Sequence, residues 1–262
     1  MSTSTLDPYR PGESLLHRLD ARVKVGLAFG LILALALTPP GAWPVLLLLG
    51  AVVAVAVILG ELRAGFVLAR SAVALPFVVA ALPLLFTVAG TTLFALPWGW
   101  TATREGLARL VSVVFKAWLS VLTALTLTAT TPFNAILATL RGWGVPSLLV
   151  SIVALTWRYL FVLVAEGQRL MRARAARSGR AEGAHGGSLA WRAHVTGGMA
   201  GSLLLRGMDR ADRIYGAMVA RGYDGEPRLL GRPPLTAGGR ALLASGLAAL
   251  ALLALLGLLF WG

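Results

Sequence analysis

Long runs of apolar residues separated by short polar segments dominate the chain. They cover about residues 23–37, 43–60, 71–94, 106–130 and 241–261, and the last is almost pure leucine and alanine. A helix needs about 20 mostly apolar residues to cross a bilayer. The pattern predicts an all-α integral membrane protein with about five transmembrane helices. Pro76 and Pro83 should kink the third of them.

Residues 131–234 have a different pattern, in which apolar positions recur among many arginines. Thr131 and Pro132 suit the N-cap and first position of a short helix, which should end near Gly142 or Gly144. The segment therefore divides the chain into an N-terminal membrane region (1–130), a helical insertion (131–234) and a last transmembrane helix (235–262).

Two long helices are predicted within this insertion. The first begins at Pro146, is apolar through Val164 and basic from Arg169 onward, and stops at Ser178. The second covers about 189–219, with a glycine C-cap after it. Both helices are amphipathic and basic, which is typical of a cytoplasmic surface.

The amino-acid composition supports a membrane protein and shows that the chain is strongly positive. Apolar residues make up 57% of the chain and charged residues 13%, yet 24 basic side chains face 11 acidic ones for a net charge of +13. Almost all of the basic side chains are arginines, since Lys24 and Lys116 are the only lysines. The positive-inside rule explains this excess without a nucleic-acid partner. With no cysteine, disulfides, thiolate metal sites and cysteine nucleophiles are excluded.

The distribution of charge predicts the orientation in the membrane. Arg63 and Arg70 lie in the second loop, whereas the first and third loops are nearly free of charge. We therefore expect a multi-pass protein of the cell (inner) membrane with a cytoplasmic N-terminus and a cytoplasmic insertion. Lys116 lies inside the fourth run, where a charge is costly, so it should face protein; a pore role is the alternative.

Several familiar catalytic patterns are missing from the sequence. There is no G-x-x-x-x-G-K-[ST], H-E-x-x-H or G-x-S-x-G pattern, and no acidic residue lies in the middle of an apolar run. The three histidines are scattered outside the runs, which predicts no metal site. Asp209 and Asp212 resemble half of a magnesium–diphosphate motif, so a membrane-embedded transferase is one alternative.

A local pattern repeats at the ends of the two basic helices. Ala176-Arg177-Ser178 ends the first, and Ala220-Arg221-Gly222 ends the second. An arginine in a last turn complements the helix C-terminal carbonyls and can still extend its fork toward a partner carboxylate. Its small neighbours permit another backbone to approach closely. Two such triplets on consecutive cytoplasmic helices indicate docking to a partner protein.

Several stretches together resemble the transmembrane T component of energy-coupling factor (ECF) transporters, and most of all its cobalt/nickel branch, the CbiQ family. They are His17–Lys24, Thr131-Pro132, Pro146 with Trp157–Tyr159, Met171–Gly179 and Leu203–Gly225. The resemblance covers nearly the whole chain in order. It departs at Ala21, where proline is usual, at Ser178 in place of glycine, and at Gly207 in place of serine.

This resemblance implies a non-enzymatic coupling subunit of an importer. Such proteins join two cytoplasmic ABC ATPases, which bind the ATP, to a substrate-binding membrane (S) subunit, here of the cobalt/nickel type. It implies that Arg177 and Arg221 contact the ATPases and that Ala176, Ser178, Ala220 and Gly222 give the close fit. The chain itself would hold no cofactor.

Two further readings stay open beside this one. A permease subunit of a conventional ABC transporter would carry one coupling segment per chain, whereas two arginine-ended helices are present here. The basic insertion could also bind anionic membrane lipid.

Overall fold

The computed structural model describes residues 8–62, 65, 71–72, 75–88, 90–95, 101–178, 188–225 and 234–261. These residues form two compact units. The first, called the bundle unit below, contains residues 8–139 and 234–261. The second, called the two-helix unit, contains residues 140–178 and 188–225. The boundaries predicted at 130/131 and 234/235 stay predictions.

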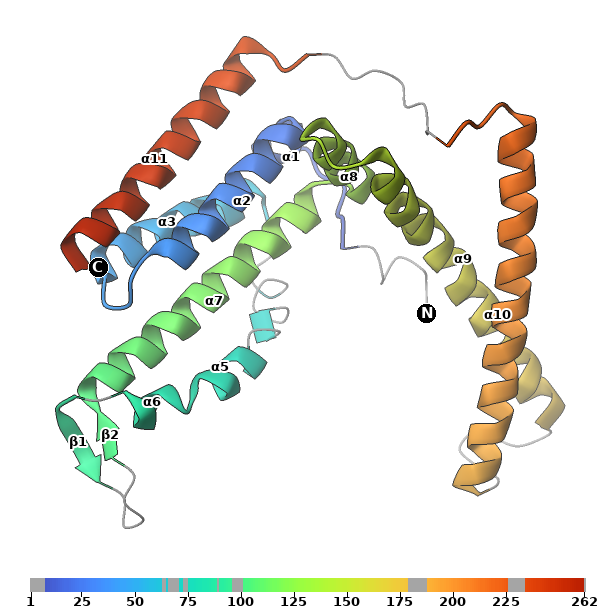
Figure 1. Cartoon of the computed structure of the whole chain (residues 1–262), viewed down its shortest axis with the longest axis horizontal. Coiled ribbons are helices and arrows are strands. Elements are labelled where there is room, and N and C mark those ends of the chain that lie inside the picture. Colours follow the sequence, from blue (N-terminus) through green and yellow to red (C-terminus); the bar gives the residue numbers. More distant parts are fainter. Residues whose placement is uncertain are drawn as a thin grey trace. The chain divides into compact units, whose positions relative to one another are not determined.

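The bundle unit is built mainly from helices (Figure 1). They are α1 (Leu15–Arg18), α2 (Ala21–Leu37), α3 (Trp43–Leu59), α5 (Leu75–Ala81), α6 (Leu84–Thr87), α7 (Arg104–Thr130), α11 (Ala237–Trp261) and all but the last three residues of α8 (Phe133–Gly142). Two short strands, β1 (Thr92–Ala95) and β2 (Thr101–Thr103), precede α7. Helix α2 packs against both α11 and α7. The expected all-α membrane fold is confirmed, with the small hairpin as its one addition among the described residues.

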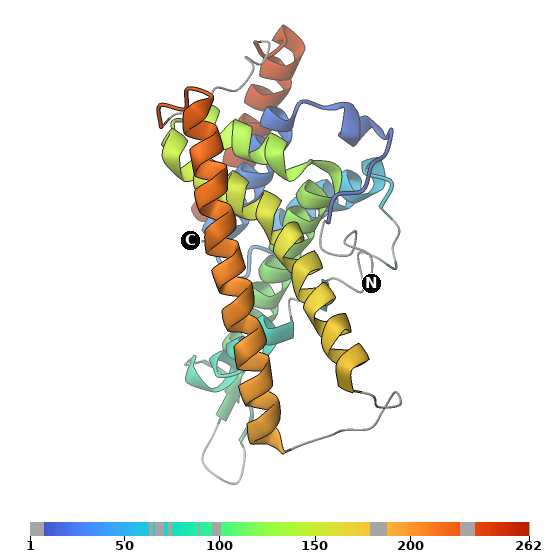
Figure 2. The same ribbon diagram turned by 90° about the vertical axis from the view of Figure 1, so that its right-hand side faces the viewer.

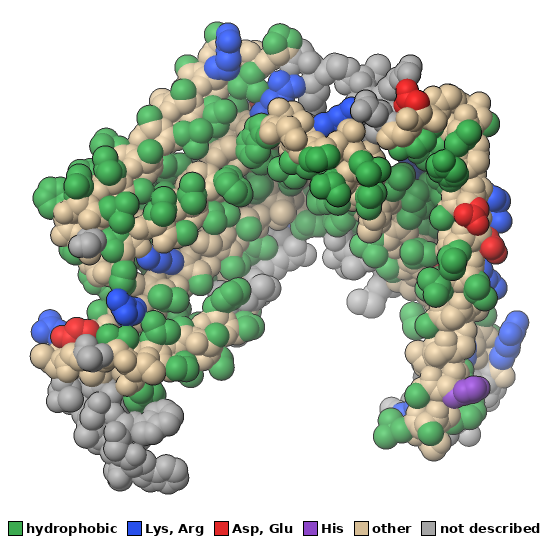
Figure 3. All heavy atoms as spheres, in the orientation of Figure 1, with side chains coloured by type: hydrophobic (Ala, Val, Ile, Leu, Met, Phe, Trp, Pro, Cys, Tyr) green, Lys and Arg blue, Asp and Glu red, His purple; other side chains and the backbone are tan. Residues whose placement is uncertain are grey.

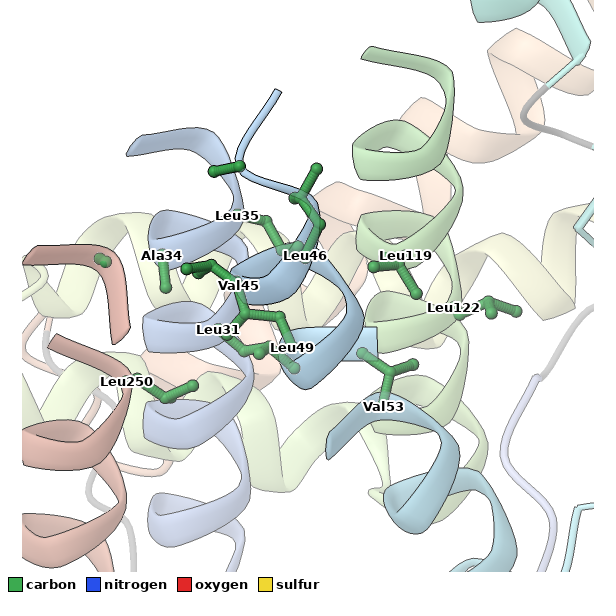
Figure 4. Packing of buried hydrophobic residues seen from close by; sticks show 12 residues of the cluster. Leu31, Ala34, Leu35, Val45, Leu46, Leu49, Val53, Leu119, Leu122 and Leu250 are labelled. Carbon is green, nitrogen blue, oxygen red and sulfur yellow. The ribbon is translucent and has the colours of Figure 1, made fainter. Parts of the chain in front are cut away.

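The core of the bundle unit lies where α2, α3, α7 and α11 meet. Leu35, Leu46 and Leu49 are completely buried there, beside Leu119 and Leu250 (Figure 4). Helix α3 and most of α2 and α11 are apolar on all sides, so the apolar side chains that face away from the core stay exposed. Such an exposed apolar surface is suited to lipid and is costly in water.

Three helices of the described chain are long and apolar enough to cross a membrane: α7, α11 and, in the second unit, residues 147–177. Helix α3 is a shorter apolar helix. The presence of a candidate among 147–177 is notable, because this helix belongs to the insertion predicted to be cytoplasmic. Its first half carries one arginine, Arg158, in a mostly apolar sequence, while its other four arginines follow in the second half.

The third apolar run is broken rather than continuous. A kink was predicted at Pro83, and the structure has a full break there: Pro83 is the N-cap of the separate helix α6, because proline has no N–H to continue the preceding helix. Pro76 lies in the first turn of α5, where proline is tolerated. The expectation of a helix as far as Phe94 is wrong, because that residue belongs to β1 and pairs with Ala102 of β2.

Hydrogen bonds fasten this hairpin to the start of α7. Thr92 pairs with Thr103 and Ala95 with Thr101, with an irregularity between Thr92 and Phe94. The Thr103 hydroxyl donates to the carbonyl of Val88 (2.7 Å) and accepts from the Gly106 amide as the N-cap of α7. These hydrogen bonds hold the residues before α7 as two paired strands, so the third apolar run does not continue as a transmembrane helix up to α7.

The two lysines of the chain cap two antiparallel helices reciprocally. Lys24, near the start of α2, donates from Nζ to the carbonyl of Thr130 at the end of α7 (2.8 Å). Lys116, within α7, donates from Nζ to the carbonyl of Thr38, the C-cap of α2. Each ammonium meets a carbonyl that has no partner inside its own helix. The expectation that Lys116 faces protein is confirmed.

The start of α8 differs from the prediction. The carbonyl of Pro132 accepts the first helical hydrogen bonds, from the amides of Ala135 (2.9 Å) and Ile136 (3.2 Å). The Thr131 hydroxyl is buried and has no hydrogen-bond partner among the described residues. Thr131 is therefore the C-cap of α7 and not the N-cap of α8. The extended backbone of Thr131 turns the chain between the two helices.

Candidate coupling site

Two long helices make up most of the two-helix unit. They are α9 (Ser147–Ser178) and α10 (Leu189–Ala220), and they cross each other (Figure 2). Helix α9 begins after Pro146, whose carbonyl accepts from the Val150 amide. Ser188 is the N-cap of α10, and its hydroxyl accepts from the amide of Trp191 (3.2 Å). Both helices were predicted with nearly these bounds.

The helices meet through two leucine–glycine contacts. A Cβ added to Gly207 would lie 3.7 Å from Leu163, and one added to Gly167 would lie 3.8 Å from Leu203. Because the higher-numbered residue of α9 meets the lower-numbered residue of α10, the helices run antiparallel through the crossing. The glycines leave room for the leucine of the opposite helix, which lets the two backbones approach closely.

An ion pair lies at the same crossing. Arg206 of α10 donates from Nη1 to Oε1 of Glu166 on α9 at 2.7 Å, and Arg169 lies one turn further along α9 with its Nε 3.3 Å from Oε2. The Glu166 side chain is 17% exposed. This pair assigns Arg206 a contact with the opposite helix.

Helix α10 ends at a glycine C-cap motif. Arg221 is the C-cap, and Gly222 follows with a φ of 81°. The amide of Gly222 donates to the carbonyl of Val219 (2.9 Å), and the amide of Tyr223 donates to that of Met218 (3.0 Å). This is the Schellman arrangement, in which glycine takes the left-handed position at no steric cost. The predicted glycine cap is confirmed.

The predicted docking residues lie at the two C-terminal tips. Ala176 and Arg177 are exposed in the last turn of α9, which ends at Ser178. Ala220 and Arg221 are exposed at the end of α10. Within the described residues, neither arginine has a carboxylate within ion-pair distance. Gly179 lies outside the described residues.

The structure separates the two arginines instead of bringing them together. Because the helices run antiparallel, their C-terminal tips point away from the crossing in opposite directions (Figures 1 and 2). Arg177 lies about 16 Å beyond Glu166 along α9, and Arg221 about 22 Å beyond Arg206 along α10, at 1.5 Å per residue. The unit therefore presents two separate cationic ends.

An apolar groove lies between the first half of α9 and the second half of α10. Its volume is about 690 Å³. Its lining includes Leu155, Tyr159, Met208, Ile214, Met218 and Tyr223. Arg210 is the charged residue in this lining. On α10 the apolar and charged side chains lie along different sides, as Figure 3 shows, so the helix is amphipathic as predicted.

Glu166 is the residue that sequence reasoning missed. A signal for it existed, because residues 163–167 read LVAEG and residues 203–207 read LLLRG. Both segments have a leucine, a charged residue three positions later and a glycine directly after it. The charges are opposite, so the two residues can form an ion pair where the segments cross. The pattern could have suggested the contact but not the crossing itself.

Comparisons with known proteins agree with the resemblance. The chain matches the CbiQ family, described as cobalt transport protein, over residues 12–230. It is 33% identical over 159 residues to a protein of Rhodobacter capsulatus named cobalt transport protein CbiQ, covering 60% of this chain and 63% of that relative. The match thus spans less than two thirds of that relative's length.

Two other relatives are matched over most of their length. Both are named energy-coupling factor transporter transmembrane protein EcfT. The one from Acidaminococcus fermentans is 30% identical, covering 98% of this chain and 97% of the relative. The one from Ruminiclostridium cellulolyticum is 28% identical over 84% of each chain. The chain therefore belongs to the CbiQ cobalt transport protein family, among the transmembrane components of energy-coupling factor transporters.

Proposed function

We propose that this chain is the coupling T subunit of an ECF-type ABC importer for cobalt or nickel. It links two cytoplasmic ABC ATPases to a substrate-binding membrane subunit. The ATPases bind and hydrolyse the ATP, and this chain acts as a scaffold that catalyses no reaction. Its N-terminus and its two-helix unit face the cytoplasm, in keeping with Arg63 and Arg70, which fall outside the described residues.

The observation that carries this proposal is the pair of arginine tips at opposite ends of crossed helices. The path from Arg177 through the crossing to Arg221 is about 40 Å long at 1.5 Å per residue. Two partner proteins can therefore each take one tip without competing for the same surface. A conventional permease with one coupling segment per chain has no need for a second tip.

The local chemistry of each tip suits a protein groove lined with carboxylates. A guanidinium presents five N–H donors in a planar fork and stays charged at all physiological pH values. The alanines at 176 and 220 leave little bulk beside each arginine. At the α10 tip the Schellman turn also fixes the backbone, so less conformational entropy is lost when Arg221 binds.

Cobalt as cargo is supported by the description of the family and by the name of the Rhodobacter capsulatus relative, and nickel is included because the resemblance is to the cobalt/nickel branch. The ion is cargo of the assembled transporter, and its selective ligands are proposed to lie in the substrate-binding partner. Membrane lipid surrounds the apolar helices of this chain and contacts its basic residues.

Charge reversal at the tips tests the docking. The tagged chain is purified from its native membranes in mild detergent, and co-purifying subunits that carry an ATP-binding P-loop are quantified by mass spectrometry. Arg221→Glu should abolish their recovery and Arg177→Glu should weaken it, because each change sets a carboxylate against the partner's carboxylates. Arg172→Glu is the matched control, since Arg172 is exposed on the same helix but lies about 7.5 Å before Arg177 at 1.5 Å per residue. Unchanged recovery with both tip changes would refute the proposal.

A further inference from the structure

Within the described residues of the two-helix unit, few contacts outside the crossing join α9 and α10. Helix α10 has no buried residue, and the groove leaves its second half apart from the first half of α9. On the other side of the crossing, Arg174 lies 5.6 Å from the ring centroid of Trp191. Among the described residues, the orientation of the helices therefore depends mainly on two leucine–glycine contacts and the pair of Glu166 with Arg206, with the Arg174–Trp191 contact beyond them.

These two kinds of contact restrain different things. The leucine–glycine contacts fix how closely the helices approach, because they are short and apolar and have no preferred direction. A charge-assisted hydrogen bond of 2.7 Å has both a preferred length and a preferred direction. Glu166 is also held on its own helix by Arg169 at 3.3 Å, which limits the positions that its carboxylate can take.

The environment of Glu166 strengthens this restraint. Its side chain is 17% exposed, whereas those of Arg206 and Arg169 are 58% and 60% exposed. A carboxylate largely removed from water is costly unless cations or hydrogen-bond donors face it. The shielded acid therefore favours the helix orientation that keeps Arg206 against it.

We propose that Glu166 is a positioning residue that sets the crossing angle of α9 and α10, and with it the sideways position of each arginine tip. This inference rests on the proposed coupling function. The angle matters because the tips are far from the crossing. At 1.5 Å per residue, Arg221 lies about 22 Å from the crossing. Rotating α10 by about 10° about the crossing would therefore move Arg221 by roughly 4 Å. A shift of this size is larger than the reach of a hydrogen bond.

The crossing angle can be measured across the groove by pulsed electron paramagnetic resonance. The chain has no cysteine, so two introduced cysteines carry the only spin labels. Ile152 on the first half of α9 and Ala217 on the second half of α10 are exposed and lie on the same side of the crossing. On this side the distance between the helices changes strongly with the angle. The full chain is labelled in lipid nanodiscs.

Glu166→Gln removes the charge and keeps the size of the side chain. We expect a broader distance distribution with its mean shifted by several ångströms, and Arg206→Gln should give the same change from the other helix. Glu166→Asp keeps the carboxylate and should restore a narrow distribution. Asp209→Asn is the matched control, because it neutralises an exposed carboxylate of α10 and should leave the distribution unchanged. Circular dichroism verifies that each variant keeps its helices.

The proposal is overturned if Glu166→Gln and Arg206→Gln keep the wild-type distribution, or if Asp209→Asn changes it as much as they do. The distance is measured on this chain without any ATPase. A failure of the docking experiment would therefore leave the distance result standing, and an unchanged distance would leave the docking of Arg177 and Arg221 untouched. The two conclusions can fail separately.

Discussion

The bundle unit and the two-helix unit are both built from long helices, but they differ in how much of each helix is buried against its neighbours. In the bundle unit, leucines of four helices bury one another almost completely, and two lysines cap the ends of neighbouring helices. In the two-helix unit, α10 buries no residue, and one ion pair joins the helices at their crossing among the described residues. The first unit is stabilised by its own contacts, whereas the second leaves most of its surface available to other molecules.

The difference shows how one chain combines anchoring with coupling. Helices that pack on several neighbours keep a fixed arrangement because many contacts must break together. Helices that meet at a single crossing depend on a few residues for their orientation, and their exposed apolar and charged faces are suited to partners. Mutations should therefore act on stability in the bundle unit and on docking in the two-helix unit.

The largest expected effect on stability lies in the bundle core. Leu49→Ala removes a completely buried side chain and should lower the free energy of unfolding by about 2–5 kcal/mol. Leu48→Ala, at a neighbouring position that is 53% exposed, is the control and should change it far less. Reversible denaturant unfolding in micelles, followed by tryptophan fluorescence, measures both. Equal effects would contradict the packed core.

A smaller effect is expected from the lysine caps. Lys24→Met keeps the length of the side chain and leaves the carbonyl of Thr130 without the ammonium that it accepts from. Unsatisfied buried polar groups cost about 1–3 kcal/mol, so the free energy of unfolding should fall by that amount. Arg22→Met removes a positive charge from the same helical turn and serves as the control in the same unfolding experiment. If both variants lose the same stability, charge and not the hydrogen bond is responsible.

The smallest stability change should accompany a clear loss of docking at the α10 tip. Gly222→Ala places a side chain at a φ of 81°, which costs about 1–2 kcal/mol for a residue with a Cβ. The distorted turn should displace Arg221 and reduce recovery of the ATPases. Gly216→Ala, inside α10 with open space around it, should instead stabilise the helix slightly. Normal ATPase recovery with Gly222→Ala would show that the turn does not position the arginine.

Much of the fold follows from local patterns in the sequence. Continuous apolar runs predicted α2, α3, α7 and α11 because burial in lipid needs no long-range information. The break at Pro83 and the glycine end of α10 were predictable because proline and glycine act on their own backbone. The prediction of a helix through the third run was wrong at its end, because apolar composition alone cannot reveal that Phe94 pairs with Ala102 in a sheet.

The candidate site divides in the same way. The sequence by itself determined that two basic helices each end in an arginine between small residues, since helix period and C-terminal signals are local. Only the tertiary structure decided that Arg177 and Arg221 lie at opposite tips, that Glu166 holds Arg206, and that Lys24 and Lys116 cap helices distant in sequence. Each of these facts depends on which helices meet and in which direction. That choice is made by packing many side chains at once, and no single segment encodes it.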